Sequence, residues 1–284
     1  MDTLVIPVVY TPTAEGENSA MLTFGSNDPD EPTYTLSLSG QAAQNIILFV
    51  PSEYPTIATA IDSAFAEDTV EVAPGAYSGS VNLLDKNLVF RGGGDPSETI
   101  LQGNGTGPVL TIEGGQSSLT RISNFTIIGG GGVQGGGVKI DGGSTPDLDH
   151  LVIAANSVSG NGGGIFIGSG GANISNVTVG YNNASGSGGA LYAAAGSAVS
   201  LGNSILWSNG STEIGSFGNV ATTYSIVAGG AEGVGNLDLD PLFVNGPGLD
   251  YSLQWESFAI DAGDPLEALD PDGTLLDMGA MFYN

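Results

Sequence analysis

The chain of 284 residues contains no cysteine. This absence excludes disulfide scaffolds, zinc–thiolate sites, iron–sulfur clusters and cysteine nucleophiles. Basic residues are also scarce, because four lysines and arginines stand against 30 aspartates and glutamates and leave a formal net charge of −26 at pH 7. Nucleic acids and anionic membranes bind to basic patches, so the composition predicts neither as a partner. Cationic partners, including Ca²⁺, are compatible with it.

Long apolar segments are missing as well. The sequence has no run of about 18 apolar residues, and Met1 and Asp2 do not begin the basic and apolar segments of a signal peptide. We therefore predict no membrane insertion, and either a cytosolic chain or a processed or trimmed piece of a longer one. The low lysine content and the abundance of acid, glycine, serine, threonine and asparagine favour an extracellular or cell-surface protein.

Glycine is abundant, with 47 residues, and the sequence repeats itself between residues 120 and 210 with a period of about 26. Three columns carry this repeat. The first column consists of the apolar residues Ile122, Leu148, Ile174 and Leu201. The second column consists of Gly130, Asn156, Asn182 and Asn209. The third column consists of the pairs Gly136-Gly137, Gly163-Gly164 and Gly188-Gly189.

Each period predicts one coil of three short strands. Segments of three to five residues rich in β-branched side chains, separated by glycine or asparagine, are too short for helical hairpins. Stacked coils place equivalent residues about 4.8 Å apart, so the apolar columns fill a continuous interior. The sequence therefore predicts an all-β fold, a single-stranded right-handed parallel β-helix.

A column of asparagines is expected at the bends between strands. Glycine tolerates positive φ freely, and asparagine, aspartate and histidine tolerate it better than most residues. The predicted ladder positions are Asn124, His150, Asn176 and Asn203, followed by the second set Asn156, Asn182 and Asn209. In the first set, stacked asparagine side chains can also hydrogen bond to one another. His150, the only histidine, fits this column as a turn residue; a chemical role is the alternative.

Both ends of the β-helix have predicted caps. A helix is indicated by apolar residues at helical spacing after Pro55-Thr56: Ile57, Ala60, Ile61, Ala64 and Phe65. The run YPTIATAIDSAFAEDTVEVAPGAYSGSV resembles the N-terminal cap of the pectate-lyase-like β-helix superfamily. The segments GNLDLDPLFVNGPGLDYSLQWESFAIDAGDP and DPDGTLLDMGAMFYN are similar to the closing segment of secreted bacterial β-helix proteins of the choice-of-anchor type. This resemblance implies the architecture and an extracellular location, and we expect the closing segment to cover the second end.

The first residues predict a different, antiparallel structure. Apolar residues alternate with polar ones on either side of a turn at residues 27–32: Leu22, Phe24, Tyr34, Leu36 and Leu38. The stretch from Leu4 to Gly40 resembles the second half of a Hydin-type immunoglobulin-like domain, with one strand before the hairpin. We expect its apolar face to pack on the next domain or on another chain.

The predicted domains are residues 1–41, a partial immunoglobulin-like segment, and residues 46–284, the β-helix. Within the second domain, we expect the N-terminal cap and first coil in residues 46–77. Further coils are expected in residues 78–235 and the closing segment in residues 236–284.

Candidate chemistry centres on Asp147 and Asp149. As alternate residues of one strand they should both point outward, beside Asn173 and Ser175 of the next coil, where the oxygens of these side chains could share Ca²⁺. Two solvated carboxylates are the alternative. The dipeptide Asp149-His150 also resembles one near the Ca²⁺ site of pectate lyases. Those enzymes use a downstream arginine or lysine as a base, and no such residue follows Lys139.

Two further patterns are weaker. On the strand after each glycine pair, the expected register points Lys139, Phe166 and Leu191 outward, which forms no carboxylate cluster. The segments Asp270-Pro-Asp272-Gly273 and 27–30 are like fragments of calcium loops, but they also fit ordinary turns.

Three function classes follow. The first is a non-catalytic structural or adhesive module of a secreted or cell-surface bacterial protein, able to self-associate. The second is a carbohydrate-binding module with exposed aromatic platforms drawn from Phe166, Tyr181, Tyr192 and Trp207. The third is a polysaccharide lyase or glycoside hydrolase. A glycan, a second copy or a cell-surface protein is the expected partner, and no cofactor is required, with Ca²⁺ as an option.

Overall fold

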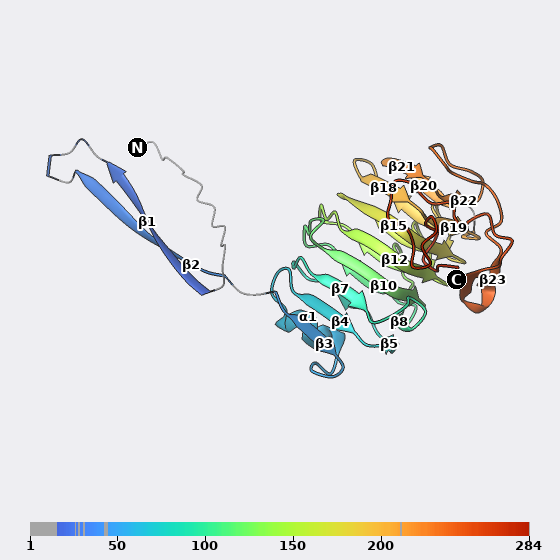
Figure 1. The fold of residues 1–284 in the computed structure, drawn as a ribbon, viewed down its shortest axis with the longest axis horizontal. Coiled ribbons are helices and arrows are strands. Elements are labelled where there is room, and N and C mark those ends of the chain that lie inside the picture. Colours follow the sequence, from blue (N-terminus) through green and yellow to red (C-terminus); the bar gives the residue numbers. More distant parts are fainter. Residues whose placement is uncertain are drawn as a thin grey trace. The chain divides into compact units, whose positions relative to one another are not determined.

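The computed structural model describes residues 16–25, 27, 29–30, 32–42, 45–210 and 212–283. The chain divides into two compact units, residues 1–46 and residues 47–284 (Figure 1). In the first unit, β1 (Gly16–Gly25) and β2 (Thr33–Ala42) form an antiparallel hairpin in which Leu22 pairs with Leu36 and Phe24 with Tyr34. These pairs place the alternating apolar side chains on one face. The strand expected before the hairpin lies outside the described residues.

The second unit is a parallel β-helix, as predicted. Its long sheet contains eight consecutive strands: β3 (Ile47–Val50), β4 (Thr69–Val72), β7 (Val89–Gly92), β10 (Arg121–Ile128), β12 (Asp147–Ala154), β15 (Gly171–Gly180), β18 (Ala198–Gly202) and β21 (Asn219–Thr223). Four more strands continue this sheet past the bend: β5 (Gly75–Ser78), β8 (Thr99–Gln102), β19 (Ile205–Trp207) and β22 (Ile226–Val227).

A second sheet closes each coil. Its strands are β6 (Val81–Asn82), β9 (Leu110–Ile112), β11 (Val138–Ile140), β14 (Ile165–Ile167), β17 (Leu191–Ala193) and β20 (Ile214–Ser216). A short third pair consists of β13 (Ser157–Val158) and β16 (Asn183–Ala184).

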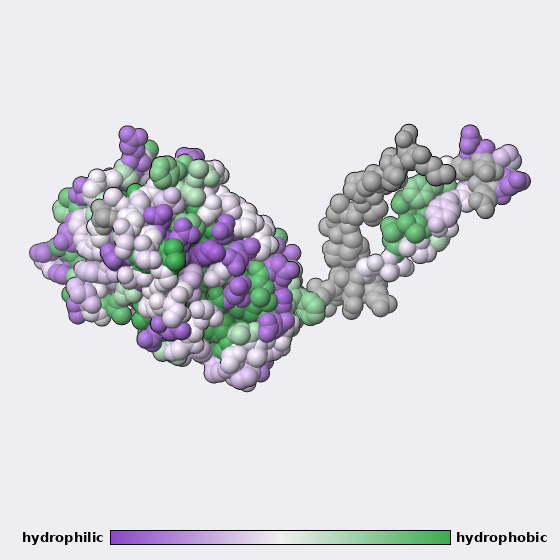
Figure 2. Space-filling model, turned by 180° about the vertical axis from the view of Figure 1, so that it is seen from behind, coloured by the Kyte–Doolittle hydropathy of each residue, from purple (hydrophilic) through white to green (hydrophobic). Residues whose placement is uncertain are grey.

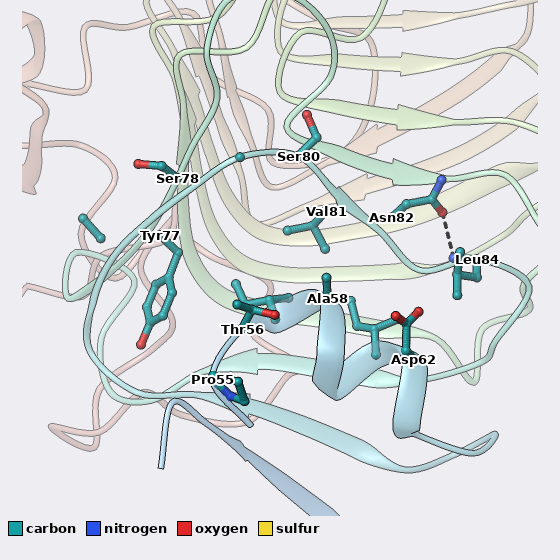
Figure 3. A pocket seen from close by; sticks show the side chains of 14 residues that line it. Pro55, Thr56, Ala58, Asp62, Tyr77, Ser78, Ser80, Val81, Asn82 and Leu84 are labelled. Atoms are coloured by element: carbon teal, nitrogen blue, oxygen red, sulfur yellow. Dashed lines mark hydrogen bonds between the residues drawn. The ribbon is translucent and has the colours of Figure 1, made fainter. Parts of the chain in front are cut away.

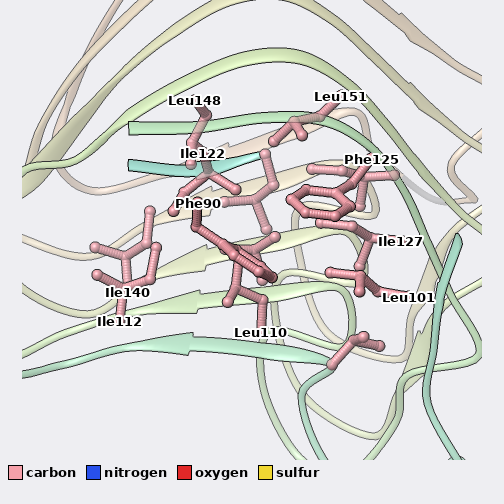
Figure 4. Packing of buried hydrophobic residues seen from close by; sticks show 14 of the residues in the cluster. Phe90, Leu101, Leu110, Ile112, Ile122, Phe125, Ile127, Ile140, Leu148 and Leu151 are labelled. Carbon is pink, nitrogen blue, oxygen red and sulfur yellow. The ribbon is translucent and has the colours of Figure 1, made fainter. Parts of the chain in front are cut away.

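The apolar column has the predicted register. Ile122 pairs with Leu148, Leu148 with Ile174, and Ile174 with Leu201. All four side chains point into the interior, where stacked aliphatic residues form one continuous core (Figure 4). Phe90 and Phe125 pack in the same core with ring centroids 4.5 Å apart and their planes tilted by 32°. Burial of such side chains in neighbouring coils is the main source of stability in this kind of repeat.

The helix α1 (Ile57–Ser63) caps the N-terminal end. Thr56 is its N-cap, and its hydroxyl accepts a hydrogen bond from the Thr59 amide while Thr59 bonds back to the Thr56 amide. Ile57, Ala60 and Ile61 are buried against β3, β4 and β6. Phe65 departs from the predicted apolar face, because α1 ends before it and the side chain is 72% exposed.

The closing segment lies along the side of the β-helix rather than over its end. Leu237 extends the stack through one parallel bridge to Ile226. The rest contains β23 (Phe243–Asn245), the 3₁₀ turn η1 (Gly246–Gly248) and β24 (Asp250–Leu253), with β23 and β24 antiparallel. The expectation that this segment covers the second end is therefore corrected: Tyr251, Met278 and Ala280 pack on the outer face of the long sheet.

Candidate functional sites

The second repeat column forms a buried hydrogen-bonded ladder. The Asn182 Oδ1 atom accepts from the backbone N and the Nδ2 of Asn156, at 3.0 and 2.9 Å, and Asn209 Oδ1 accepts from the same two atoms of Asn182. Each Nδ2 also donates to a backbone carbonyl of an earlier coil. The column begins with Gly130, where a Cβ atom would overlap the Gly136 carbonyl oxygen.

Glu213 ends this ladder, and sequence reasoning missed it. Its Oε1 accepts from the Asn209 amide at 3.1 Å and its Oε2 from Asn209 Nδ2 at 2.6 Å, so the two carboxylate oxygens replace the single amide oxygen of the other steps. Burial raises the pKa of Glu213, although the hydrogen bonds from Asn209 oppose this shift. No repeat signal marks the residue, because it lies only four positions after Asn209.

The turn residues that begin with Asn124 have the expected positive φ angles, but their side chains have other hydrogen-bond partners than expected. The φ angles of Asn124, His150, Asn176 and Asn203 are 60°, 46°, 53° and 48°. In the described chain, however, no hydrogen bond joins the three asparagine side chains to one another. Asn176 Nδ2 donates to Asp149 Oδ1 at 3.0 Å, and Asn203 Oδ1 accepts from the backbone N of Asp264 in the closing segment. The expected side-chain ladder is therefore corrected to the Asn156 column.

Asp147 and Asp149 both point outward from β12, beside Asn173 and Ser175 of β15. Asp147 Oδ1 accepts from Asn173 Nδ2 at 2.8 Å, and Asp147 Oδ2 lies 3.9 Å from Arg121 Nε. The neighbours of these carboxylates are thus largely N–H donors. Although burial raises it, the pKa of Asp149 is lowered overall, because His150 and Asn176 hydrogen bond to the carboxylate.

The histidine is held between this carboxylate and the end of the chain. His150 Nδ1 lies 2.9 Å from Asp149 Oδ2, and the His150 ring lies 5.0 Å from the ring of Phe282. Lys139, the basic residue nearest in sequence, lies on the second sheet, where its Nζ bonds to Glu113 at 2.9 Å. The structure therefore does not bring Lys139 to Asp149 and His150.

An aromatic column lies on the outer face of the second sheet. Lys139 pairs with Phe166 and Phe166 with Tyr192, so the predicted outward position of Leu191 is wrong, and Leu191 is buried. The rings of Phe166 and Tyr192 stack at 5.5 Å with an interplanar angle of 4°, and Phe217 approaches Tyr192 edge-on at 6.4 Å. We call Phe166, Tyr192 and Phe217 the aromatic column. Phe166 is only 5% exposed, whereas Phe217 is 78% exposed.

The other two predicted platforms are partly covered by the closing segment. Tyr181 contacts Tyr251 with ring centroids 6.3 Å apart, and Trp207 packs with buried residues that include Leu253. Beneath the same segment, Val152 and Ala154 of β12 are buried against Tyr251 and Ala280. The closing segment therefore covers part of the long sheet, and Tyr181 and Trp207 line a pocket together with its residues.

A cavity of about 450 Å³ lies at the N-terminal end, between α1 and the segment from Ala76 to Leu84 (Figure 3). Its lining combines apolar side chains of α1 with the hydroxyl groups of Ser78 and Ser80. Apolar surface also gathers at this end of the β-helix on the face shown in Figure 2. None of the predicted site residues lines this cavity.

No family model and no curated protein sequence matches the chain. Among solved structures, the chain is similar to the crystal structure of pectate lyase Pel9A, with a TM-score of 0.34 and 11% sequence identity. That match covers 85% of this chain and 97% of that chain. The parallel β-helix itself is evident from the pairing of this chain's own strands. Among the described residues, no helix is long and apolar enough to span a membrane.

Proposed function

We propose that the chain is a non-catalytic structural or adhesive module of a secreted or cell-surface protein. The observation that carries this proposal is that the polar side chains of the repeat are occupied by hydrogen bonds within the fold. Asn156, Asn182 and Asn209 satisfy one another inside the coils, and the side chains of Asn203 and Thr178 hold the closing segment through its backbone amides. A stiff stack of coils, with part of one outer face covered by its own closing segment, serves as a spacer or a scaffold for contacts.

The hairpin fits the same proposal. A partial Hydin-type immunoglobulin-like domain would have antiparallel strands with one apolar face, as this hairpin has. A choice-of-anchor-type protein would have a closing segment of this kind. Both belong to extracellular bacterial architectures. The net charge of −26 would keep such modules apart in solution.

The lyase alternative has less support from the geometry. Proton abstraction from a sugar needs a base and a group that stabilises the developing charge. His150 is already bonded to Asp149 and its ring contacts Phe282, while Lys139 lies on another sheet.

The decisive test is an activity assay over a panel of polysaccharides, following new reducing ends and the absorbance of unsaturated sugars. We expect no turnover with or without Ca²⁺. Turnover by the intact chain that is lost in His150→Ala would overturn the non-catalytic proposal.

Carbohydrate binding is the second candidate, and the aromatic column favours it. The Phe217 ring is exposed beside Tyr192, and a flat apolar ring next to a phenol hydroxyl offers both stacking and hydrogen bonding to a sugar. Binding to a glycan array should fall in Phe217→Ala and persist in Phe65→Ala, a matched control with similar exposure at the other end. Equal signals from both variants would exclude the aromatic column as the platform.

A further inference from the structure

Three acceptor oxygen atoms gather in the closing segment around one hydroxyl group. Thr274 Oγ1 lies 2.7 Å from Asp272 Oδ1, 3.4 Å from Asp270 Oδ1 and 3.5 Å from the carbonyl oxygen of Leu275. A hydroxyl has a single hydrogen, so it can donate fully to only one of these three acceptors. The Thr274 backbone N–H also donates to Asp272 Oδ1 at 2.8 Å, so the carboxylate oxygen left without a donor among the described residues is Oδ2 of Asp270.

The carboxylate of Asp270 is buried without full hydrogen bonding, which is energetically unfavourable. It is only 7% exposed, and its Oδ2 is buried with no hydrogen-bond partner among the residues that the structure describes. A buried carboxylate beside another one needs either a shared proton or a cation.

The chain has no basic side chain left to supply that cation. Its only lysines and arginines are Lys86, Arg91, Arg121 and Lys139. Lys86 Nζ donates to three backbone carbonyls near the end of α1, and the other three pair with carboxylates of the β-helix coils. An external cation is therefore the alternative to a proton shared between Asp270 and Asp272.

We propose that the segment from Asp270 to Leu275 binds one Ca²⁺ ion through the carboxylates of Asp270 and Asp272, the Thr274 hydroxyl and the Leu275 carbonyl. Calcium accepts six to eight oxygen ligands in flexible arrangements, whereas Mg²⁺ demands a near-ideal octahedron and gives up its waters reluctantly. Mixed side-chain and backbone oxygens on an irregular loop suit the larger ion, and water completes the shell.

The affinity should be low. In the described chain, no three histidine, aspartate or glutamate side chains gather as a metal-binding group, so the site offers two carboxylates. Asp277 is not a ligand, because its two oxygens accept the backbone N–H groups of Asp261 and Tyr283, at 2.8 and 2.6 Å. We expect a dissociation constant of about 0.1–1 mM, as in calcium sites of extracellular modules.

Bound Ca²⁺ would fix the part of the closing segment that lies on the long sheet. Directly after the proposed ligands, Leu276 accepts from the Gly263 amide, and the amide of Gly279 donates to the Asn203 carbonyl at 2.8 Å. The ion thus stabilises the covering of the sheet, and the proposal does not depend on whether the β-helix binds glycans.

Isothermal titration of the full chain with CaCl₂ tests the proposal, against NaCl of matched ionic strength. We expect saturable binding of one ion, at least a tenfold loss of affinity in Asp270→Asn and Asp272→Asn, and unchanged affinity in Asp250→Asn. Asp250 is a matched control, because it is an exposed aspartate that, like Asp272, accepts the backbone N–H two residues later.

A double variant, Asp147→Asn with Asp149→Asn, separates this site from the one predicted on β12. Binding that survives in this double variant and is lost in Asp272→Asn supports the proposal. Binding that is lost only in the double variant, or no Ca²⁺ effect beyond that of NaCl, would overturn it. Circular dichroism of each variant verifies the fold, and the exposed Asp272 can be changed without disturbing the core.

Discussion

The buried asparagine ladder gives the sharpest prediction about stability. In Asn182→Ala, the backbone N–H of Asn156 and one hydrogen of its side-chain amide lose their acceptor, Asn182 Oδ1. Both donors belong to a residue that is 1% exposed, so water cannot replace the lost partner. Each buried donor left unpaired costs about 1–3 kcal/mol, so we expect a loss of about 2–6 kcal/mol in the free energy of unfolding.

Urea unfolding followed by circular dichroism measures this loss. Asn183→Ala is the control, because Asn183 is the adjacent residue, and its side chain is exposed on the coil surface. The same chemical change at Asn183 should cost less than about 0.5 kcal/mol. If the two variants unfold within about 1 kcal/mol of each other, the ladder does not have the energetic role that its hydrogen bonds imply.

Three further predictions concern the ionisation of Glu213, the turn position of His150 and the N-terminal hairpin. Because burial raises the pKa of Glu213, its contribution to stability is present at low pH and is lost as the pH rises through the folded value. Glu213→Gln removes the titrating group, so the melting temperature of the variant should depend less on pH than that of the wild type, and an unchanged pH dependence would contradict this. His150→Asn should change the free energy of unfolding by less than about 0.5 kcal/mol, because asparagine has the same positive φ at Asn124 and Asn176; a loss of several degrees in melting temperature would reveal another role. Deleting residues 1–41 should leave a soluble β-helix, because residues 47–284 form their own compact unit; light scattering that detects aggregates would show that the hairpin is an integral cap.

Much of the fold could be predicted because each coil of a parallel β-helix needs the same kinds of residue at the same positions. Ile122, Leu148 and Ile174 stack in register, so each apolar residue in the sequence predicts the environment of the next. Thr56 and the apolar spacing after it likewise predict α1 from local chemistry alone. In both cases the relevant neighbours lie within one turn of helix or one coil.

Side-chain size could have shown the correct alignment of the glycine-pair column in the last coil. Aligning Gly188-Gly189 with the earlier glycine pairs placed Tyr192 inward, but the backbone N of Ile165 bonds to the Ala190 carbonyl, so Gly189-Ala190 is the true counterpart of Gly163-Gly164. A tyrosine in a narrow coil would bury its hydroxyl without a partner. Leu191 and Ala193, on either side of it, are the residues that fit the interior.

The packing position of the closing segment could not be predicted from the sequence, for a different reason. Its backbone amides bond to Thr178 and Asn203, which lie 102 and 61 residues away from Ala280 and Asp264, and no repeat marks such pairs. Distant packing of this kind depends on the shapes of both surfaces rather than on local preference. In the sequence Asp270 likewise reads as an ordinary turn residue, because nothing in the local pattern of Asp, Pro and Gly marks the burial of its side chain.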